Sequence, residues 1–443
     1  GTRLGERAHL ILSADYFNAD GIDDYRNYDW FRSCAAIVNP LATPGSGQPA
    51  RVRRCGVQSS SQSLGGMITA GPLAGNQFLP GGVFTPVVYG GFRTASSMVG
   101  GSNPYDQGKY FQPLPAQRRI NAFGHFKYDL GSGIELFADA MYGTSRIRFV
   151  GTLQGQYGPN AVTIYRDNAY LPQSVRDRMI AADLQSFTMS VASPQIGMLR
   201  YTAQSETWRA SGGLRADLGS GWRAEAYYTH GENNQYVRGD NHVLASRVYA
   251  AVDAVNVNGQ TICQISVANP NSGCVPINLF GGDAAIPDAA RNYLTGSNYA
   301  NEKTRQDVVE ATISGDAFST WAGPVSVAVG GGYRREFVRR VPDPLSAGPR
   351  NVAGGVPRGI PVGYLSGTGP FALGSSAPIS GSYNVWETFG EVLVPLAEDG
   401  PTLLHKLDLN AAIRYTNYST SGGVTTWKGG LTWQPVEDLR LRI

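Results

Sequence analysis

The motif Asp-Leu-Gly-Ser-Gly occurs twice, at residues 129–133 and 217–221, and each copy joins two runs in which apolar and polar residues alternate. In the run before the first copy, the apolar positions are Ile120, Ala122, Gly124, Phe126 and Tyr128. Successive side chains of a β-strand point to opposite faces of the sheet. Each copy of the motif therefore predicts the turn of a hairpin that has one apolar and one polar face.

Similar alternating runs recur along the chain, with short turns at one end and long polar segments at the other. They predict eleven strands: Ala8–Phe17, Arg119–Tyr128, Ile134–Ile147, Thr207–Ala216, Trp222–Glu232, Asp307–Gly315, Val325–Glu336, Val385–Leu396, Leu407–Tyr418, Thr425–Trp433 and one that begins at Leu439. A tilted strand needs about nine to eleven residues to cross a bilayer. Short turns that alternate with long loops are typical of an outer-membrane barrel. We therefore predict an all-β fold, a partial transmembrane antiparallel β-barrel with long extracellular loops and short periplasmic turns.

Composition agrees with this interpretation but leaves an alternative open. The chain is 42% hydrophobic and has no run of eighteen apolar residues, so it offers no transmembrane helix. A large soluble β-sandwich or solenoid would also alternate, but the repeated asymmetry of turn length favours the barrel. The net charge of +3 is too small to indicate nucleic-acid binding.

Alternation also predicts which side chains meet lipid. The residues expected on the lipid face are Leu10, Leu12, Phe126, Leu136, Trp208, Ala224, Val327, Val329, Ile413 and Leu431. Those expected on the lumen face are Asn121, Lys127, Glu225, Arg414 and Lys428.

The long segments near 18–115, 148–204, 233–301 and 342–382 are rich in Gly, Pro, Ser and Asn. Two of them contain apolar residues at helical spacing, at Val175–Leu184 and Val243–Ala254. We expect each of these helices to be small and to cap its own loop.

The four cysteines form two pairs that are close in sequence, Cys34 with Cys55 and Cys263 with Cys274. Each pair lies within one predicted surface loop, which in an oxidising compartment predicts two disulfides. Closing loops of this size is worth about 3 kcal/mol in the chain-entropy model. A four-cysteine metal site is the alternative, but no Cys-x-x-Cys spacing supports it.

Charged residues near the C-terminal end suggest that one face of these strands is in contact with water. Glu387 and Glu391 share a strand face, and Arg414 and Lys428 fall on the polar faces of neighbouring strands. A glycosidase would use such a glutamate pair as acid and nucleophile. We favour a charge ladder that faces the lumen, where charge costs little. The five histidines show no metal-ligand spacing, so we expect no enzyme, metal or cofactor.

Several loop residues could contact a ligand, because aromatic rings beside arginines bind sugars, aromatic chelators and anions. They are Tyr25, Tyr28, Trp30, Phe31, Arg51, Arg53 and Arg54 in the first long segment and Phe280 in the third. The same residues could instead pack the loops against themselves.

An ordered set of short stretches resembles one known family. They are Asn168-Ala-Tyr-Leu-Pro-Gln-Ser-Val, Asn269-Pro-Asn-Ser-Gly-Cys-Val-Pro-Ile-Asn-Leu-Phe-Gly, Trp386-Glu-Thr-Phe-Gly-Glu-Val-Leu-Val-Pro and Leu439-Arg-Leu-Arg. Together they resemble the barrel of TonB-dependent outer-membrane receptors, over most of the chain and in the order of the family.

The resemblance implies a barrel of about 22 strands closed by an N-terminal plug. On this basis residues 1–443 are expected to be a partial barrel domain, without the plug and without the last strands. It also implies a monomer in the outer membrane of a Gram-negative bacterium. Its partners would be membrane lipid, TonB and a small-molecule or oligosaccharide ligand.

The implied function is active import of a scarce, bulky ligand such as a siderophore–iron complex, cobalamin or an oligosaccharide. A passive porin-type channel and a soluble or surface-anchored all-β binding protein remain the alternatives.

Overall fold

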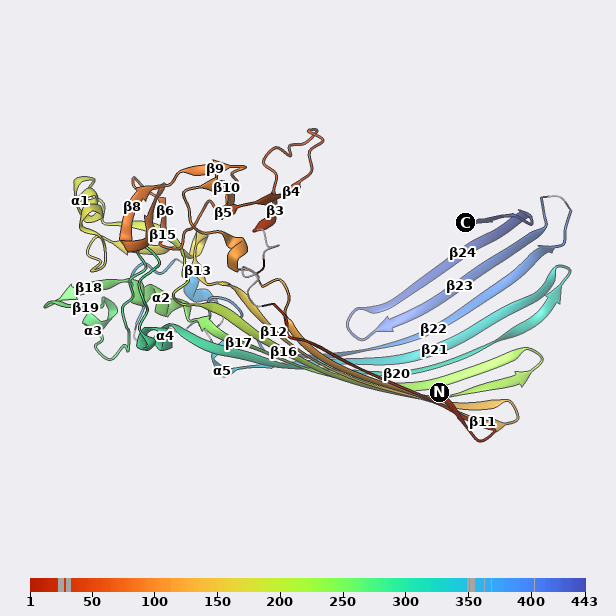
Figure 1. The fold of residues 1–443 in the computed structure, drawn as a ribbon. Coiled ribbons are helices and arrows are strands. Elements are labelled where there is room, and N and C mark those ends of the chain that lie inside the picture. The colour runs from red at the N-terminus through yellow and green to blue at the C-terminus, as the bar shows by residue number, and fades with distance from the viewer. Residues whose placement is uncertain are drawn as a thin grey trace.

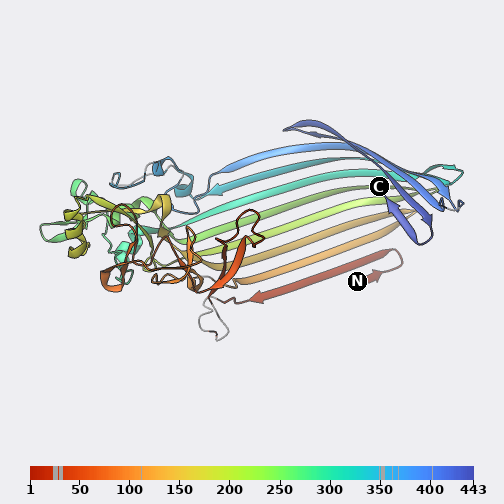
Figure 2. The ribbon, with the colours of Figure 1, turned by 90° about the horizontal axis from the view of Figure 1, so that it is seen from above.

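The computed structural model describes residues 1–22, 28, 33–110, 112–348, 350, 355–361, 363–367, 369–401 and 403–443. Its main feature is a curved antiparallel sheet of twelve strands, with a separate mass of loops at one end (Figure 1). Each strand pairs with its neighbours in chain order, and the two outermost strands do not pair with each other among the described residues. The sheet is therefore an open, curved wall, as Figure 2 shows from above.

The strands of the main sheet are β1 Thr2–Leu4, β2 Ala8–Ala19, β11 Ala116–Gly131, β12 Ile134–Leu153, β16 Met198–Gly219, β17 Trp222–Val243, β20 Thr295–Thr320, β21 Gly323–Pro342, β22 Ile379–Glu398, β23 Lys406–Tyr418, β24 Gly422–Val436 and β25 Leu439–Arg442. The predicted strands are all present, but most are longer than predicted. β16 and β17 have 22 residues each, or roughly 70 Å at the usual rise per residue. The expected length came from the bilayer alone, whereas these strands continue beyond it toward the loops.

The repeated motif forms the same turn in both places. In the first copy the Gly131 N–H donates to the Asp129 carboxylate at 2.8 Å, and in the second Gly219 donates to Asp217 at 3.0 Å. Gly131, Ser132 and Gly133 all have positive φ, which glycine adopts at little cost. The motif thus specifies a compact turn, and its second occurrence repeats that turn one hairpin further along.

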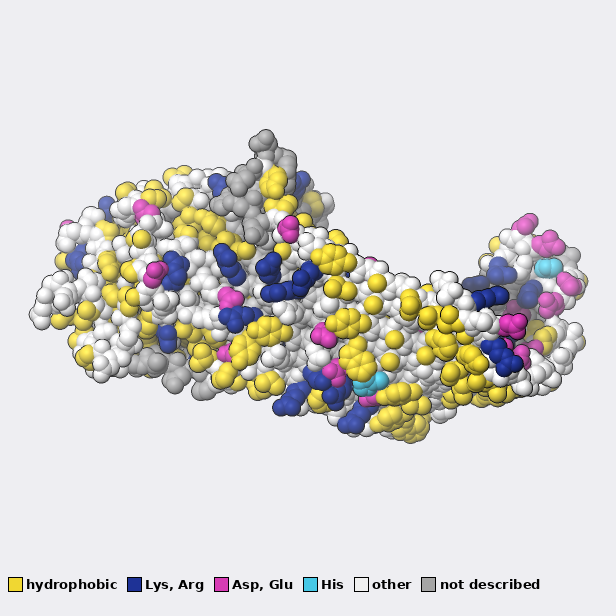
Figure 3. Space-filling model, turned by 60° about the horizontal axis from the view of Figure 1, so that its bottom comes forward, with side chains coloured by type: hydrophobic (Ala, Val, Ile, Leu, Met, Phe, Trp, Pro, Cys, Tyr) yellow, Lys and Arg dark blue, Asp and Glu magenta, His cyan; other side chains and the backbone are white. Residues whose placement is uncertain are grey.

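Register divides the side chains between two faces as alternation predicts. Along one row, Leu136 lies opposite Leu214 and Tyr128; along another, Ile413 lies opposite Gly390. Rows that include Glu225, Arg414 and Lys428 lie on the other face. The apolar face is the convex one, which Figure 3 shows with a broad hydrophobic band.

Exposed aromatic side chains border this apolar band on the side of the loops. They are Tyr16, Tyr142, Trp208, Tyr228, Tyr333, Trp386 and Tyr415, and we call them the aromatic girdle. Tyrosine and tryptophan favour the membrane–water interface. From β2 to β23 the girdle residues do not share one register row, as expected for strands that are tilted against the membrane normal.

The loops contain the remaining elements. The strands are β3 Cys34–Val38, β4 Arg51–Cys55, β5 Val57–Ser59, β6 Met67–Ala70, β7 Asn76–Leu79, β8 Val83–Pro86, β9 Tyr89–Gly91, β10 Ser97–Gly101, β13 Gly155–Gln156, β14 Val162–Tyr165, β15 Ser186–Ala192, β18 Ala254–Val257 and β19 Gln260–Cys263. The helices are α1 Gln173–Ala181, α2 Ala245–Val252, α3 Ile265–Ala268, α4 Asp288–Leu294 and α5 Pro344–Ala347, with short 3-10 turns η2 Pro80–Gly82, η3 Gln107–Tyr110, η4 Gly158–Asn160 and η5 Tyr364–Ser366.

All four long loops share one hydrophobic core, which we call the loop core. It joins Phe78 of the first loop, Met179 of the second, Val248 and Leu279 of the third, and Tyr364 of the fourth. Strand β15 of the second loop pairs with β6 of the first. Both predicted helices exist as α1 and α2, but the expectation that each caps only its own loop is wrong, because Met179 and Val248 are buried in the shared core.

Within the described residues, no helix combines the length and the apolar character needed to cross a membrane.

The two faces predict different responses to an introduced charge. Ala226→Arg places the charge on the convex face and should destabilise the folded barrel by roughly 2–4 kcal/mol if that face meets lipid. Ala328→Arg, the matched control, places it on the concave face, where Ala328 lies opposite Glu391. Unfolding of the full-length protein in lipid vesicles by denaturant measures both. Equal losses would refute the assignment of faces.

Candidate functional site: a loop assembly over a charged concave wall

The concave wall carries a chain of ion pairs across four strands. Glu135 of β12 contacts Lys127 of β11 at 3.4 Å and Arg215 of β16 at 3.3 Å, and Arg215 contacts Glu225 of β17 at 2.7 Å. Each pair is partly exposed, so each adds little stability on its own. Together they make a hydrated, charge-balanced surface on the side away from the apolar band.

The predicted wall residues Glu387, Glu391, Arg414 and Lys428 lie on this same concave face. Arg414 contacts Glu387 at 3.3 Å, and the Thr416 hydroxyl donates to the same carboxylate at 3.4 Å. Glu391 and Lys428 both lie opposite Ala412 and line a hollow of about 390 Å³. Arg414 on the neighbouring strand is thus an ion-pair partner of Glu387, as expected for a ladder of charged residues along this face.

Among the described residues, no group of three or more His, Cys, Asp or Glu side chains is arranged to hold a metal ion.

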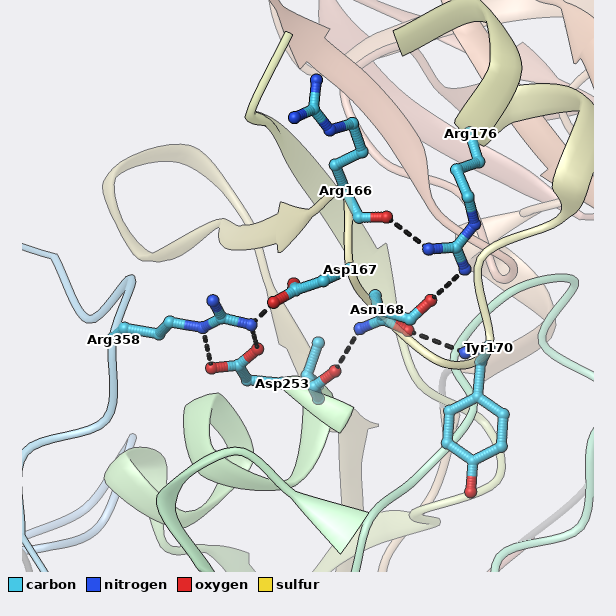
Figure 4. A network of polar contacts seen from close by, with 8 residues as sticks. Arg166, Asp167, Asn168, Tyr170, Arg176, Asp253 and Arg358 are labelled. Carbon is cyan, nitrogen blue, oxygen red and sulfur yellow. Dashed lines mark hydrogen bonds and ion pairs between the residues drawn. The ribbon is translucent and has the colours of Figure 1, made fainter. Parts of the chain in front are cut away.

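An ion-pair cluster around the buried Asp253 carboxylate ties three loops together (Figure 4). Arg358 of the fourth loop donates from Nε and Nη2 to both carboxylate oxygens of Asp253 in the third loop, at 2.6 and 2.8 Å. Nη2 also donates to Asp167 of the second loop at 2.7 Å. Beside this contact, Asn168 Nδ2 donates to the Val252 carbonyl at 2.7 Å. We call this cluster the loop clasp.

Burial raises the pKa of the Asp253 carboxyl, and the Arg358 guanidinium opposes that effect. Burial disfavours the charge on Arg358, but its hydrogen bonds to Asp253 and Asp167 outweigh burial and raise the pKa of the guanidinium. The pair is bidentate, the geometry in which arginine and carboxylate interact most strongly. The clasp therefore fixes the relative positions of the loops.

The hairpin of β3 and β4 stands apart from the loop core. Cys34 and Cys55 lie opposite each other in its register and are disulfide-bonded, and Cys263 is bonded to Cys274, the pairing that the sequence predicts. In Figures 1 and 2 the hairpin projects over the concave face at its loop end.

Three arginines make this hairpin strongly basic. Arg51 and Arg53 are exposed, and Arg54 stacks on the Phe92 ring with its guanidinium carbon 4.3 Å from the centroid. None of the three forms an ion pair among the described residues. Arg51 Nη1 donates to the Ala36 carbonyl at 3.4 Å, and a role for Arg51 and Arg53 in ligand contact stays a prediction.

Other predicted contact residues are placed differently. Tyr28 is exposed, whereas Tyr25, Trp30 and Phe31 lie outside the described residues. Phe280 is only 4% exposed and packs in the loop core, with its ring centroid 4.7 Å from that of Phe78. This burial gives Phe280 a packing role and removes it from the candidate contacts.

Sequence reasoning missed the loop clasp. Asp167, Asp253 and Arg358 lie in three loops and are ordinary in sequence context. The one local signal was Asn168, which falls within a stretch that carries the family resemblance.

A family model described as the β-barrel of TonB-dependent receptor-like proteins matches residues 141–443. The chain belongs to the TonB-dependent receptor family. Members of this family are outer-membrane transporters of Gram-negative bacteria and not enzymes. No curated protein matches the chain.

Several solved structures are similar to this chain. A double mutant of the ferric enterobactin receptor from Pseudomonas aeruginosa is 11% identical, with 99% of this chain and 39% of that chain covered and a TM-score of 0.44. A single mutant of the same receptor is 12% identical, with 100% and 44% covered and a TM-score of 0.41. The RagAB peptide transporter is 10% identical, with 72% and 30% covered and a TM-score of 0.36. The chain thus spans less than half of the length of each.

The loop clasp predicts a measurable loss of stability in the loops. Arg358→Ala leaves the buried Asp253 carboxylate without its ion pair and should destabilise the loop assembly by about 3 kcal/mol. The matched control is Arg166→Ala, because Arg166 pairs at 4.0 Å with Asp183, whose side chain is 96% exposed, and such pairs are worth less than about 1 kcal/mol. Limited proteolysis of the loops measures both. Similar protection in the two variants would contradict the role of the clasp.

A buried histidine predicts that the loops loosen in acid. His242 is 0% exposed, its Nδ1 lies 2.9 Å from the Leu373 carbonyl oxygen, and its Nε2 has no partner among the described residues. Burial lowers the pKa of His242, although the Leu373 hydrogen bond and Asp240 oppose this. The folded protein therefore resists protonation that the unfolded chain accepts near pH 6.5. Stability is fully present above that pH and falls as the pH drops toward the lowered pKa of the folded state.

Hydrogen exchange at the Ala372 amide tests this, because that N–H donates to the Val243 carbonyl next to His242. After correction for the intrinsic rate, protection should decrease from about pH 7.5 to about pH 5.5, across the range where histidine titrates. The variant His242→Leu should abolish the dependence. An unchanged dependence in that variant would assign it to another group.

Proposed function

We propose that the full-length protein is an outer-membrane receptor that imports a scarce, bulky, negatively charged ligand by TonB-coupled transport. The transporter class follows from the family, whereas the ligand, the partner and the energy source are proposals. A ferric chelate is the ligand class that we favour over cobalamin and neutral oligosaccharides.

The observation that carries the ligand class is the basic hairpin. Its exposed residues Arg51 and Arg53 have no carboxylate partner among the described residues, and the hairpin itself projects over the concave face (Figure 1). Guanidinium groups bind carboxylate and catecholate-type oxygens through paired, charge-assisted hydrogen bonds. Because a disulfide closes the base of the hairpin, the arginines are presented with less loss of chain entropy on binding.

The concave wall supports passage of such a ligand. Its ion pairs are exposed, and positive and negative side chains alternate along it. A hydrated anion that passes along the wall therefore meets no single strong binding site. The amide, hydroxyl and ionic groups there would also suit contact with a plug domain.

A passive porin-type channel is the second candidate, and the long loops argue against it. Loops this long are usually functional or disordered, and here all four share one core and three of them are joined by the loop clasp. A channel for small solutes needs no such construction, whereas a receptor for a dilute ligand needs a fixed binding surface.

Uptake of labelled ligands into cells with and without TonB tests the proposal. We expect uptake of a ferric chelate to require TonB, and Arg51→Gln/Arg53→Gln to weaken ligand binding roughly tenfold or more, as for the loss of two charge-assisted contacts. Deletion of residues 34–55 should abolish binding while the barrel still folds.

The control is Arg3→Gln/Arg7→Gln, which removes two exposed arginines at the opposite end of the sheet. It should bind normally. Undiminished uptake without TonB would favour the passive channel, and uptake of neutral oligosaccharides alone would overturn the ligand class.

A further inference from the structure

The basic hairpin carries a disulfide on an open surface, away from the loop core. Cys34 and Cys55 lie directly opposite each other on β3 and β4. These two strands form a sheet of their own among the described residues. Cys34 is half-buried, whereas Cys55 is exposed. The position of Cys55 therefore leaves its sulfur open to an external thiol.

The face of the hairpin that bears the disulfide also bears two arginines. Side chains two residues apart on a strand share a face, so Arg51 and Arg53 point to the same side as Cys55. Arg53 is about 7 Å from Cys55 along the strand, which is within the screening length of about 8 Å in physiological salt. Its guanidinium group attracts an anionic reagent to the sulfur. The same positive charge stabilises the thiolate that leaves when the S–S bond breaks.

One carboxylate lies beside the base of the hairpin, and local donors already bind it. The Ser33 hydroxyl donates to Asp106 Oδ1 at 2.5 Å, and the Gly108 N–H donates to the same oxygen at 3.0 Å. Asp106 is only 9% exposed, whereas Arg51 and Arg53 are exposed. Among the described residues, the exposed charge on this face of the hairpin is therefore positive.

The second disulfide has the opposite surroundings. Cys263 is 0% exposed and packs with Ala250 and Ile265, and the half-buried Cys274 packs against them. The segment 254–282 contains no charged residue. A thiolate has to enter an apolar, uncharged site to reach this bond. Access and local charge both predict slower exchange here than at the hairpin.

We propose that the Cys34–Cys55 bond is a site of thiol–disulfide exchange with anionic low-molecular-weight thiols. The external thiolate attacks Sγ of Cys55, the bond to Cys34 breaks, and its electron pair leaves on Cys34 Sγ, which takes a proton from water. A second external thiolate attacks the external sulfur of the mixed disulfide and releases Cys55 as a thiolate. Two external thiols are thus oxidised to one disulfide while the protein disulfide is reduced to two thiols.

Exchange opens the hairpin, because few other contacts close it at this end. The Gly56 N–H donates to the Ser33 carbonyl at 2.9 Å, one residue beyond the disulfide. A two-stranded hairpin without further support is marginally stable in water. The modification therefore controls how firmly Arg51 and Arg53 are held. Its chemistry does not depend on the transported ligand.

The test exposes the full-length protein in detergent to reduced glutathione, a thiol with net negative charge, or to cysteamine, a cationic thiol, at equal thiolate concentrations. Acid quenching, alkylation and peptide mass spectrometry follow each disulfide. With glutathione, we expect Cys34–Cys55 to react roughly tenfold or more faster than Cys263–Cys274, and this advantage to shrink as salt is added.

A charge-removing variant separates the role of the arginines from simple exposure. Arg51→Gln/Arg53→Gln should slow the reaction of Cys34–Cys55 with glutathione roughly fivefold and should not slow the reaction with cysteamine. The matched control, Arg3→Gln/Arg7→Gln, removes two exposed arginines at the opposite end of the sheet. It should react like the parent with both thiols.

Hydrogen exchange reports the state of the hairpin, because the Gly56 amide donates to the Ser33 carbonyl and the Asn39 amide to the Ala50 carbonyl. Parent-like protection before thiol is added shows that the hairpin of each arginine variant is folded. After thiol exchange, protection of both amides should fall roughly tenfold or more, and Cys34→Ser/Cys55→Ser should show the same low protection without thiol.

Three results would each overturn the proposal. They are equal reaction rates at the two disulfides, equal slowing of glutathione and cysteamine by the arginine substitutions, and unchanged protection of the Gly56 amide after exchange.

Discussion

A sheet that crosses a bilayer has to satisfy every backbone N–H and C=O group within itself, because hydrocarbon offers no partner. The strands from β11 to β23, each paired on both sides in a continuous antiparallel register, meet this constraint. Once the register is set, the alternation of successive side chains decides which face of the sheet each residue occupies. It gives the convex face to Leu136, Leu214 and Ile413, and it gives the concave face to the ion pairs of Glu135 and Arg215. A slip of one residue in any strand would exchange these faces.

The same strands carry the four long loops well beyond the apolar band. Strands of 20 to 26 residues raise the four long loops on a rigid wall, so the loops can pack against one another instead of against lipid. Their shared core is apolar and well buried, with Phe78, Met179 and Tyr364 contributed by three different loops. The loop clasp adds a directional contact to this core, because a bidentate arginine–carboxylate pair tolerates little rotation.

The sequence predicted contacts between residues that are close in the chain and did not predict contacts between residues that are far apart in it. The turns at Gly131 and Gly219 and the alternation around Phe126 are local, and they predicted the hairpins and the faces. The disulfides were also predictable, since Cys34 and Cys55 belong to one loop. By contrast, Phe280 could not be assigned correctly, because the residues that bury it, such as Phe78, lie about 200 positions away in the chain. Asp253 and Arg358 were missed for the same reason: neither residue is unusual until the loops are folded together.

The division between the loop core and the basic hairpin has a mechanical consequence. The second, third and fourth loops are held by the core and by the clasp, so a change in one of them has to be accommodated by the others. The β3–β4 hairpin pairs only with itself in the sheet topology, and its disulfide preserves its shape while leaving its base as the connection to the first loop. A ligand gripped by Arg51 and Arg53 could therefore move the hairpin as a unit against a fixed platform. Closure over the concave face would then require little rearrangement of packed side chains.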